Sequence, residues 1–267
     1  MASEIGWYLY ALLSHEDLPP VTGIDGGSPL SLIAENGIAA LASPVSLAEF
    51  GAEALRRNLD DVRWLEEKAR LHESIVEAAL AKGPVLPMKF GTIFLDVERI
   101  REVIRGSAQR MREALEFLTD KEEWGVKAFA NREALRASVL RSDPALLALS
   151  KEASTKPSGQ KYFLRRKIEE LASGKSLERE ERLTRDFLEA MEKTVVDLVA
   201  PPPLLPEAMQ AETLVLNLAC LVKREGAEAF LAGVEQWNRS YGEDGFRLVT
   251  SGPWPPYHFV PRLEDEG

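Results

Sequence analysis

Hydrophobic and polar residues follow one another in blocks that predict alternating strands and helices. The first block, Ile5 to Leu13, is apolar and aromatic, which is typical of a buried strand. Two shorter apolar runs, residues 30–34 and 37–42, flank Glu35-Asn36-Gly37, and this spacing predicts a β-hairpin. Residues 84–94 form another short apolar segment with β character.

Apolar residues three and four positions apart predict the helices of the first half. A short helix begins at Ser46, with Glu49 in the position of a capping box. Two longer helices span about residues 60–82, where Gly83 stops the helix, and about residues 96–118. This order of elements predicts a ferredoxin-like α/β sandwich over residues 1–119.

The second half has a longer helical pattern and a small sheet. A strand at residues 123–130 precedes a helical region from 131 to about 200, which breaks near Pro144 and at 155–159. Four prolines are expected to end this region: Pro201, Pro202, Pro203 and Pro206.

Strand, helix and strand are then expected at residues 213–222, 225–241 and 246–251. We therefore expect an α+β fold with two domains: the ferredoxin-like domain 1–119, and an α+β domain 120–251 with a long helical region and a small sheet. A Pro- and aromatic-rich tail, 252–267, follows and is expected not to be helical, because its prolines are closely spaced.

Composition narrows the classes of function. The chain has 267 residues with 45% hydrophobic residues and a net charge of −10, which suits a folded protein and disfavours a nucleic-acid backbone as main partner. Cys220 is the only cysteine, so the chain has no internal disulfide. The first residues lack the pattern of a signal peptide, and no apolar run has the length of a membrane span, so we expect a cytoplasmic protein.

Catalytic and metal-binding patterns are poor. None of the histidines, His15, His72 and His258, has a second His or Cys at a metal-ligand spacing, so no metal site is predicted. His72 falls in an apolar helix stripe and is expected to be a buried histidine with its hydrogen bonds satisfied. Cys220 lies in an apolar strand pattern and is expected to be an inert buried thiol. We expect neither a catalytic site nor a cofactor.

Three segments combine Gly, Pro and aromatic residues in an unusual way: 83–94 (GPVLPMKFGTIF), 123–127 (EWGVK) and 251–260 (SGPWPPYHFV). They have the order and the separations of the corresponding segments in gas vesicle proteins GvpF and GvpL. Weaker matches at residues 7–10, 43–46, 64–73 and 158–167 extend this similarity over nearly the whole chain. The sequence therefore resembles the GvpF/GvpL family.

This resemblance implies an accessory or minor protein of gas vesicles, which are hollow shells made largely of a small hydrophobic subunit, GvpA. It further implies binding to GvpA and to other accessory proteins, two α+β domains, and no cofactor or reaction. On this basis we expect a non-enzymatic assembly protein located in the cytoplasm and the gas vesicle. Homo-oligomerisation stays open.

The segments have structural and partner-binding interpretations. The structural one covers Pro84, Pro87, Phe90, Gly91, Trp124, Gly125, Gly252, Pro253 and Pro256. Candidate partner-binding residues are the basic Lys161, Arg165, Arg166 and Lys167, and the aromatic Trp254, Tyr257 and Phe259 of the tail. The alternatives are that the basic residues form a solvated helix face and that the tail packs on this chain's own body.

A soluble acidic protein with exposed sheet edges could cover a shell subunit before assembly, for example by strand addition. Two other functions stay open. One is a scaffold that bridges accessory proteins without touching the shell subunit, and the other is a small-molecule enzyme on a ferredoxin-like fold.

Overall fold

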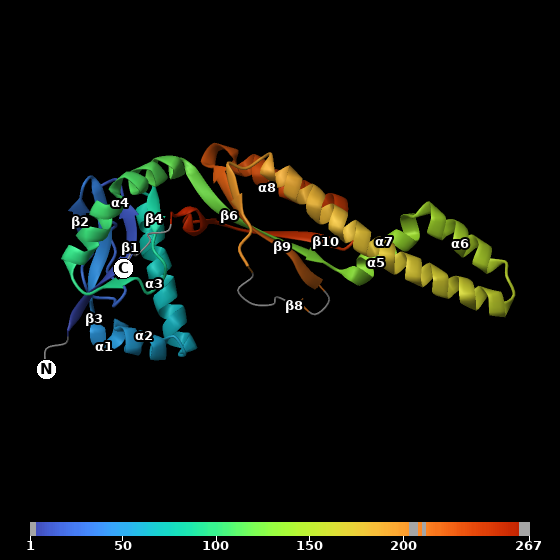
Figure 1. Ribbon diagram of the computed structural model, residues 1–267, viewed down its shortest axis with the longest axis horizontal. Helices are drawn as coiled ribbons and strands as arrows, with labels where there is room; N and C mark the ends of the chain where they lie inside the picture. The colour runs from blue at the N-terminus through green and yellow to red at the C-terminus, as the bar shows by residue number, and fades with distance from the viewer. Residues whose placement is uncertain (1–3, 203–207, 210–211, 262–267) are drawn as a thin grey trace. The chain divides into compact units, whose positions relative to one another are not determined.

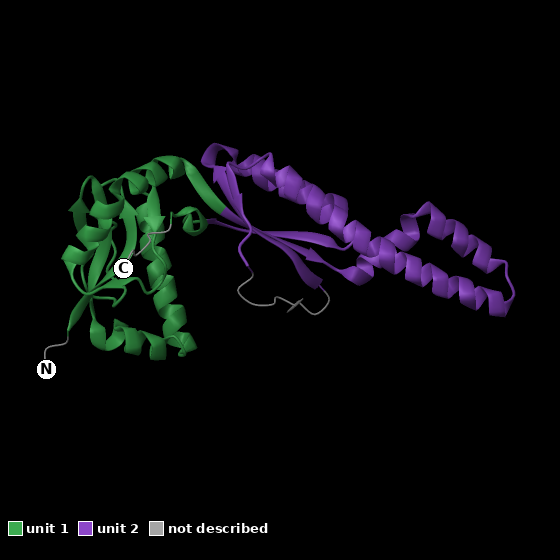
Figure 2. Cartoon of the chain, viewed as in Figure 1, with its two compact units in different colours: residues 1–123, 254–267 green, residues 124–253 purple. Residues whose placement is uncertain are grey.

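The computed structural model describes residues 4–202, 208–209 and 212–261, and the chain divides into two compact units (Figures 1 and 2). Unit 1 comprises residues 1–123 and 254–267, and unit 2 comprises residues 124–253. Each unit combines helices with one five-stranded sheet, which confirms the α+β fold class. The expected domains 1–119 and 120–251 and the separate tail 252–267 stay predictions.

Unit 1 is built on an antiparallel sheet with the strand order β2-β3-β1-β4, in which β5 also pairs with β1. The strands are β1 (Ile5–Leu13), β2 (Ser31–Glu35), β3 (Ile38–Ser46), β4 (Val85–Pro87) and β5 (Ile93–Phe94). Asn36 and Gly37 close the β2–β3 hairpin with positive φ angles of 50° and 76°, as the sequence predicts. The apolar segment after Gly83 forms two short strands, β4 and β5, separated by a turn.

The helices of unit 1 are α1 (Leu47–Phe50), α2 (Ala52–Asn58), α3 (Val62–Leu80) and α4 (Val97–Leu118). Ser46, Asp61 and Asp96 accept hydrogen bonds from backbone amides at the starts of α1, α3 and α4. These caps confirm the three expected helix starts.

The ferredoxin-like arrangement is not confirmed for the N-terminal half. Its order is three strands, three helices, two strands and a helix, which differs from the β-α-β-β-α-β order of that fold. The latter order occurs in unit 2, when the short β8 is left aside and the helices between β6 and β7 are taken together.

The core of unit 1 explains why β1 is apolar along its whole length. Tyr8, Tyr10 and Leu13 pack in one cluster with residues of α3. Leu9 and Leu12 lie outside that cluster but are also buried, and α4 packs against the sheet as well. A strand covered on both faces needs no alternation of polar and apolar residues.

Unit 2 contains most of β6 (Lys121–Ala130), then α5 (Arg132–Ser142), α6 (Pro144–Ser154) and α7 (Ser158–Glu192). These are followed by β7 (Asp197–Val199), β8 (Ala208–Met209), β9 (Glu212–Lys223), a 3-10 turn (Arg224–Gly226), α8 (Ala227–Tyr241) and β10 (Phe246–Trp254). The sheet has the order β10-β6-β9-β7, with β8 on β9. The second half of α7 and α8 pack on it through Phe187, Met191, Phe230 and Val234.

Two expectations for this half are wrong. The helical region ends at Glu192 rather than near residue 200, and β7 pairs with β9 before Pro201 is reached. The strand expected at 246–251 continues to Trp254, so Gly252 and Pro253 lie in β10. Pro203 and Pro206 lie outside the described residues.

The tail contains one helical turn. Residues Tyr257–Phe259 form a 3-10 turn, although the prolines were expected to exclude a helix. The turn fits between Pro256, at its N-cap, and Pro261. None of the residues within the turn is a proline, so each of them keeps its backbone amide donor.

The helix α6 and the first half of α7 extend beyond the sheet of unit 2 as an antiparallel pair, which we call the arm (α6 and residues 158–175; Figure 1). A second apolar cluster, separate from the cluster over the sheet, joins the arm to α5: Val139 of α5 with Leu146, Ala153, Ile168 and Ala172 of the arm. The outer surface of the arm is therefore free to carry side chains that the core does not need.

Candidate functional site

A buried polar network in unit 1 joins the first Gly/Pro segment, residues 83–94, to the first strand. The Gly91 amide donates to the Tyr8 hydroxyl at 2.8 Å. The same hydroxyl lies 3.1 Å from His72 Nδ1, and His72 Nε2 lies 3.1 Å from the Met88 carbonyl. Tyr8 and His72 are both buried. Hydrogen bonds to these two buried side chains thus hold the turn at residues 88–92 against the core.

The direction of each hydrogen bond follows from the groups involved. A carbonyl can only accept, so His72 carries its proton on Nε2 and donates to Met88. The Nδ1 atom then accepts from the Tyr8 hydroxyl, which in turn accepts from Gly91. The network is complete with a neutral histidine, which confirms the expectation of a satisfied interior His72.

Burial sets the protonation of this network. It lowers the pKa of His72 to about 4, since a charged ring would lose its hydration, and the bond to Met88 offsets this only in part. Burial also raises the pKa of Tyr8, so the hydroxyl keeps its proton. A neutral histidine and a neutral tyrosine at this site serve structure rather than proton transfer at neutral pH.

The residues after β10 attach to the same region. The Tyr257 ring stacks on His72 with 6.4 Å between ring centroids, and its hydroxyl donates to Glu73 Oε2 at 3.0 Å. Burial, followed by the neighbouring Glu73, raises the pKa of Tyr257. The backbone amide and ring Nδ1 of His258 lie 3.0 Å and 2.6 Å from the buried carboxylate of Glu123.

The three aromatic residues proposed to bind partners differ in their burial. Tyr257 and Phe259 are half-buried, whereas Trp254 is 40% exposed. Tyr257 packs on unit 1 itself, as in the alternative of a tail that binds its own chain. His258, whose position the sequence does not predict, is held by Glu123 of the second Gly/aromatic segment.

The other residues of the three segments have identifiable positions. Pro87 is buried in β4 opposite Ala11, Pro84 is half-buried, and Phe90 lies among the rings of Tyr8, Trp64 and His72. Gly91 has a φ of 82°, a conformation that favours glycine.

In unit 2, Trp124 packs on Phe230, and Gly125 lies where a Cβ would be 2.6 Å from Ser251 Oγ. Gly252 and Pro253 are joined by a cis peptide in β10, and Pro256, in unit 1, is buried.

An open apolar groove lies beside the first segment. It has a volume of about 430 Å³, within the usual range of small binding pockets. Its lining is mostly aliphatic and comes from α1, α2 and the stretch around β5: Leu47, Phe50, Gly51, Ala52, Leu55, Arg56, Leu59, Gly91, Ile93 and Leu95. Two of these are large exposed apolar side chains, Leu59 (42% exposed) and Leu95 (72% exposed).

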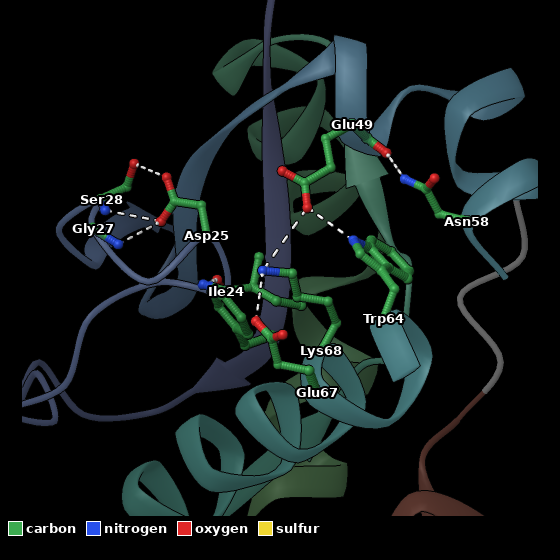
Figure 3. Close-up of polar contacts among 10 residues, drawn as sticks. Ile24, Asp25, Gly27, Ser28, Glu49, Asn58, Trp64, Glu67 and Lys68 are labelled. Carbon is green, nitrogen blue, oxygen red and sulfur yellow. Dashed lines mark hydrogen bonds and ion pairs between the residues drawn. The ribbon is translucent and has the colours of Figure 1, made fainter. Parts of the chain in front are cut away.

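Polar contacts hold the walls of the groove in place (Figure 3). Glu49 of α1 accepts a hydrogen bond from Trp64 Nε1 of α3 at 2.9 Å, and its backbone carbonyl accepts one from Asn58 at the end of α2. The buried Lys68 lies 3.8 Å from Glu49 and 3.3 Å from Glu67. These bonds tie α1 and α2 to α3, so the groove is a preformed feature.

The predicted basic residues lie on the arm. Arg165, Arg166 and Lys167 are exposed and Lys161 is half-buried, and among the described residues none of the four forms an ion pair. Tyr162 and Phe163 stand beside them, 64% and 72% exposed, with their rings 5.8 Å apart. The four basic residues belong to unit 2, whereas Trp254, Tyr257 and Phe259 belong to unit 1.

Other titratable groups do not assemble into a reactive set in the described part of the chain. Cys220 is fully buried as a free thiol, as expected. Among the described residues there is no cluster of three or more His, Cys, Asp or Glu side chains that could hold a metal ion. Within the same residues, no helix has the length and apolar character needed to cross a bilayer.

The fold and the surface indicate the class of protein to which the chain belongs. It is a two-unit α+β protein with a preformed apolar groove and a basic, aromatic arm. Proteins bind other proteins through features of this kind. The family model described as "Gas vesicle synthesis protein GvpL/GvpF" matches residues 6–261. The chain therefore belongs to the GvpL/GvpF family and has a role in gas vesicle formation.

Individual relatives agree with this assignment. The chain is 29% identical to gas vesicle protein L of Streptomyces sp. (strain CB03234), over 100% of this chain and 97% of that protein. It is 28% identical to gas vesicle protein F of the same organism, over 95% and 98%.

Solved structures of gas vesicle protein GvpF share the fold. The structure from Anabaena sp. PCC7120 has a TM-score of 0.68 at 21% identity and covers 98% of this chain and 99% of that one. The structure from Microcystis aeruginosa has a TM-score of 0.63 at 22% identity, with 96% and 99% covered.

Proposed function

We propose that this protein is a non-enzymatic assembly factor that binds the hydrophobic shell subunit GvpA through the groove of unit 1 and delivers it to the growing vesicle. The observation that carries this proposal is the groove itself. Its aliphatic lining is preformed, and Leu59 and Leu95 project from it although they would be expected to be buried.

The physical reason is aggregation. A subunit with an apolar, gas-facing surface associates with itself before assembly unless that surface is covered. Unit 1 offers an apolar contact on an acidic body, since it carries 14 basic and 24 acidic side chains. Such a body keeps a complex with an apolar client in solution.

Beside β5, groove binding is favoured over strand addition. The β5 edge is only two residues long, so it offers few backbone hydrogen bonds to an incoming strand. Leu55, Leu59 and Leu95 offer a larger apolar contact beside it.

Binding to other accessory proteins belongs to the same proposal. The arm supports it, because its exposed aromatic and basic residues do not contribute to the core of unit 2. The same feature supports the second candidate function, a scaffold that bridges accessory proteins without shell-subunit contact.

The experiment follows light scattering of shell subunit diluted from denaturant, with and without an equimolar amount of this protein. An unrelated acidic protein serves as control. Suppression of scattering together with a co-eluting complex is the expected result. Unchanged aggregation and no complex would contradict shell-subunit binding and favour the scaffold.

A further inference from the structure

The charges of the chain are divided unevenly between the two units. Unit 2 has 19 basic and 19 acidic side chains, so the whole net charge of −10 belongs to unit 1. Within the neutral unit 2, residues 151–168 hold six basic side chains and one acidic side chain, Glu152. One end of the arm is therefore strongly positive in a protein that is acidic elsewhere.

The aromatic pair of the arm lies within this positive stretch. Tyr162 and Phe163 project from α7, whose inward-facing residues Leu164, Ile168 and Ala172 pack on α6. Exposing two neighbouring rings to water is unfavourable, and Tyr and Arg are the residue types that most often anchor protein interfaces. The combination points to a partner surface that is apolar at its centre and acidic around it.

The groove of unit 1 is apolar and belongs to the acidic unit of the chain. Its aliphatic lining includes residues that are next in sequence to exposed acidic side chains: Glu53 follows Ala52, Asp60 follows Leu59, and Asp96 follows Leu95. Arg56 also lines the groove and the exposed Arg57 follows it, but the unit as a whole carries ten more acidic than basic side chains. A volume of about 430 Å³ has room for aromatic side chains.

We propose that the arm of one molecule docks, through Tyr162, Phe163 and the basic residues beside them, into the apolar groove of the acidic unit 1 of a second copy. Because the two surfaces differ, the contact is head-to-tail, and the pair keeps one unused groove on the first molecule and one unused arm on the second. Such contacts continue into rings or open chains rather than stopping at a dimer.

This inference uses the groove to which the proposed function assigns the shell subunit, and it adds regulation of that site. Copies of the protein cover one another's grooves when no client is present, and shell subunit displaces the arm. Self-association is measured in the absence of shell subunit, so its failure and the failure of the proposed function are distinguishable.

The first test is sedimentation velocity of the purified full chain from about 2 to 200 µM, at 50 mM and 500 mM NaCl. We expect concentration-dependent species larger than a dimer at low salt and at least tenfold weaker association at high salt. Phe163→Gln with Arg166→Glu should abolish the association. The matched control Leu177→Gln, at a 47% exposed site on the same helix, should leave it unchanged.

A mixing experiment tests the pairing of surfaces. The arm variant keeps its groove, and a groove variant, Leu95→Gln with Leu59→Gln, keeps its arm. Each variant alone should be monomeric, and their mixture should form a one-to-one complex that grows no further. A monomeric wild-type protein at 200 µM, an arm variant that still associates, or a mixture without complex would overturn the proposal.

Discussion

Replacing Tyr8 by phenylalanine removes one oxygen atom from the centre of unit 1. The hydroxyl accepts from the Gly91 amide at 2.8 Å and donates to His72 Nδ1. Without the hydroxyl, the buried His72 Nδ1 has no hydrogen-bond donor, and the Gly91 amide at the groove wall loses its acceptor. Leaving a buried polar group unsatisfied costs about 1–3 kcal/mol, and we expect a loss in this range for Tyr8→Phe.

The loss should be local first, because residues 88–92 connect two very short strands, β4 and β5. Hydrogen exchange followed by mass spectrometry reads this directly in peptides covering residues 83–94. A cost of 1–3 kcal/mol corresponds to roughly 5- to 150-fold faster exchange there. Peptides from α8 in unit 2 should exchange as in the wild type.

Tyr162→Phe is the matched control, since it removes the same atom from a 64% exposed ring. It should change exchange nowhere by more than about twofold. If Tyr8→Phe behaves like this control at residues 83–94, the hydrogen-bond network does not hold the groove wall.

Two further predictions concern stability. Since folding lowers the pKa of His72 from its ordinary value near 6.5 to about 4, the contribution of its neutral ring is complete above pH 6.5 and is lost as pH falls toward 4. That contribution is about 3 kcal/mol, and its loss is partly offset by Glu73, whose pKa is raised by burial. Urea unfolding of unit 1 at pH 7 and pH 4 should show the loss of stability. The variant His72→Gln should show a smaller difference between the two pH values. Gly245 has a φ of 98° and a Cβ there would lie 2.7 Å from the Asn131 carbonyl, so Gly245→Ala should cost about 2 kcal/mol in urea unfolding. The control Gly233→Ala, in open space on α8, should be neutral or stabilising, and equal midpoints for the two variants would contradict the prediction.

Local signals were read correctly from the sequence where the structure uses local interactions. Asp61 and Asp96 accept from the first amides of α3 and α4, and Asn36-Gly37 closes its hairpin, because caps and tight turns depend on neighbouring residues. The burial of His72 followed from its place in a helical stripe.

Long-range pairing was missed. The three residues of β7 form a strand only because β9 lies beside them, with Asp197 opposite Leu221. The extension of β10 through Gly252 and Pro253 likewise depends on the neighbouring strand rather than on propensity.

The groove was missed for a related reason, since it is assembled from α1, α2 and a stretch about 40 residues further along the chain. One signal was present. Leu95 precedes the N-cap Asp96 and would be expected to pack against Ile100 as a hydrophobic staple. Its 72% exposure is the departure from that rule which marks the surface.

The central claim is that the groove binds the shell subunit, and the most direct test is the double variant Leu59→Gln with Leu95→Gln in the light-scattering assay. Covering the exposed parts of these two side chains should contribute about 2 kcal/mol, so roughly 30-fold more of the variant should be needed for the same suppression. Leu147→Gln with Leu177→Gln, each 47% exposed on α6 and α7 of unit 2, is the control and should act like the wild type. Equal suppression by both double variants would contradict the account.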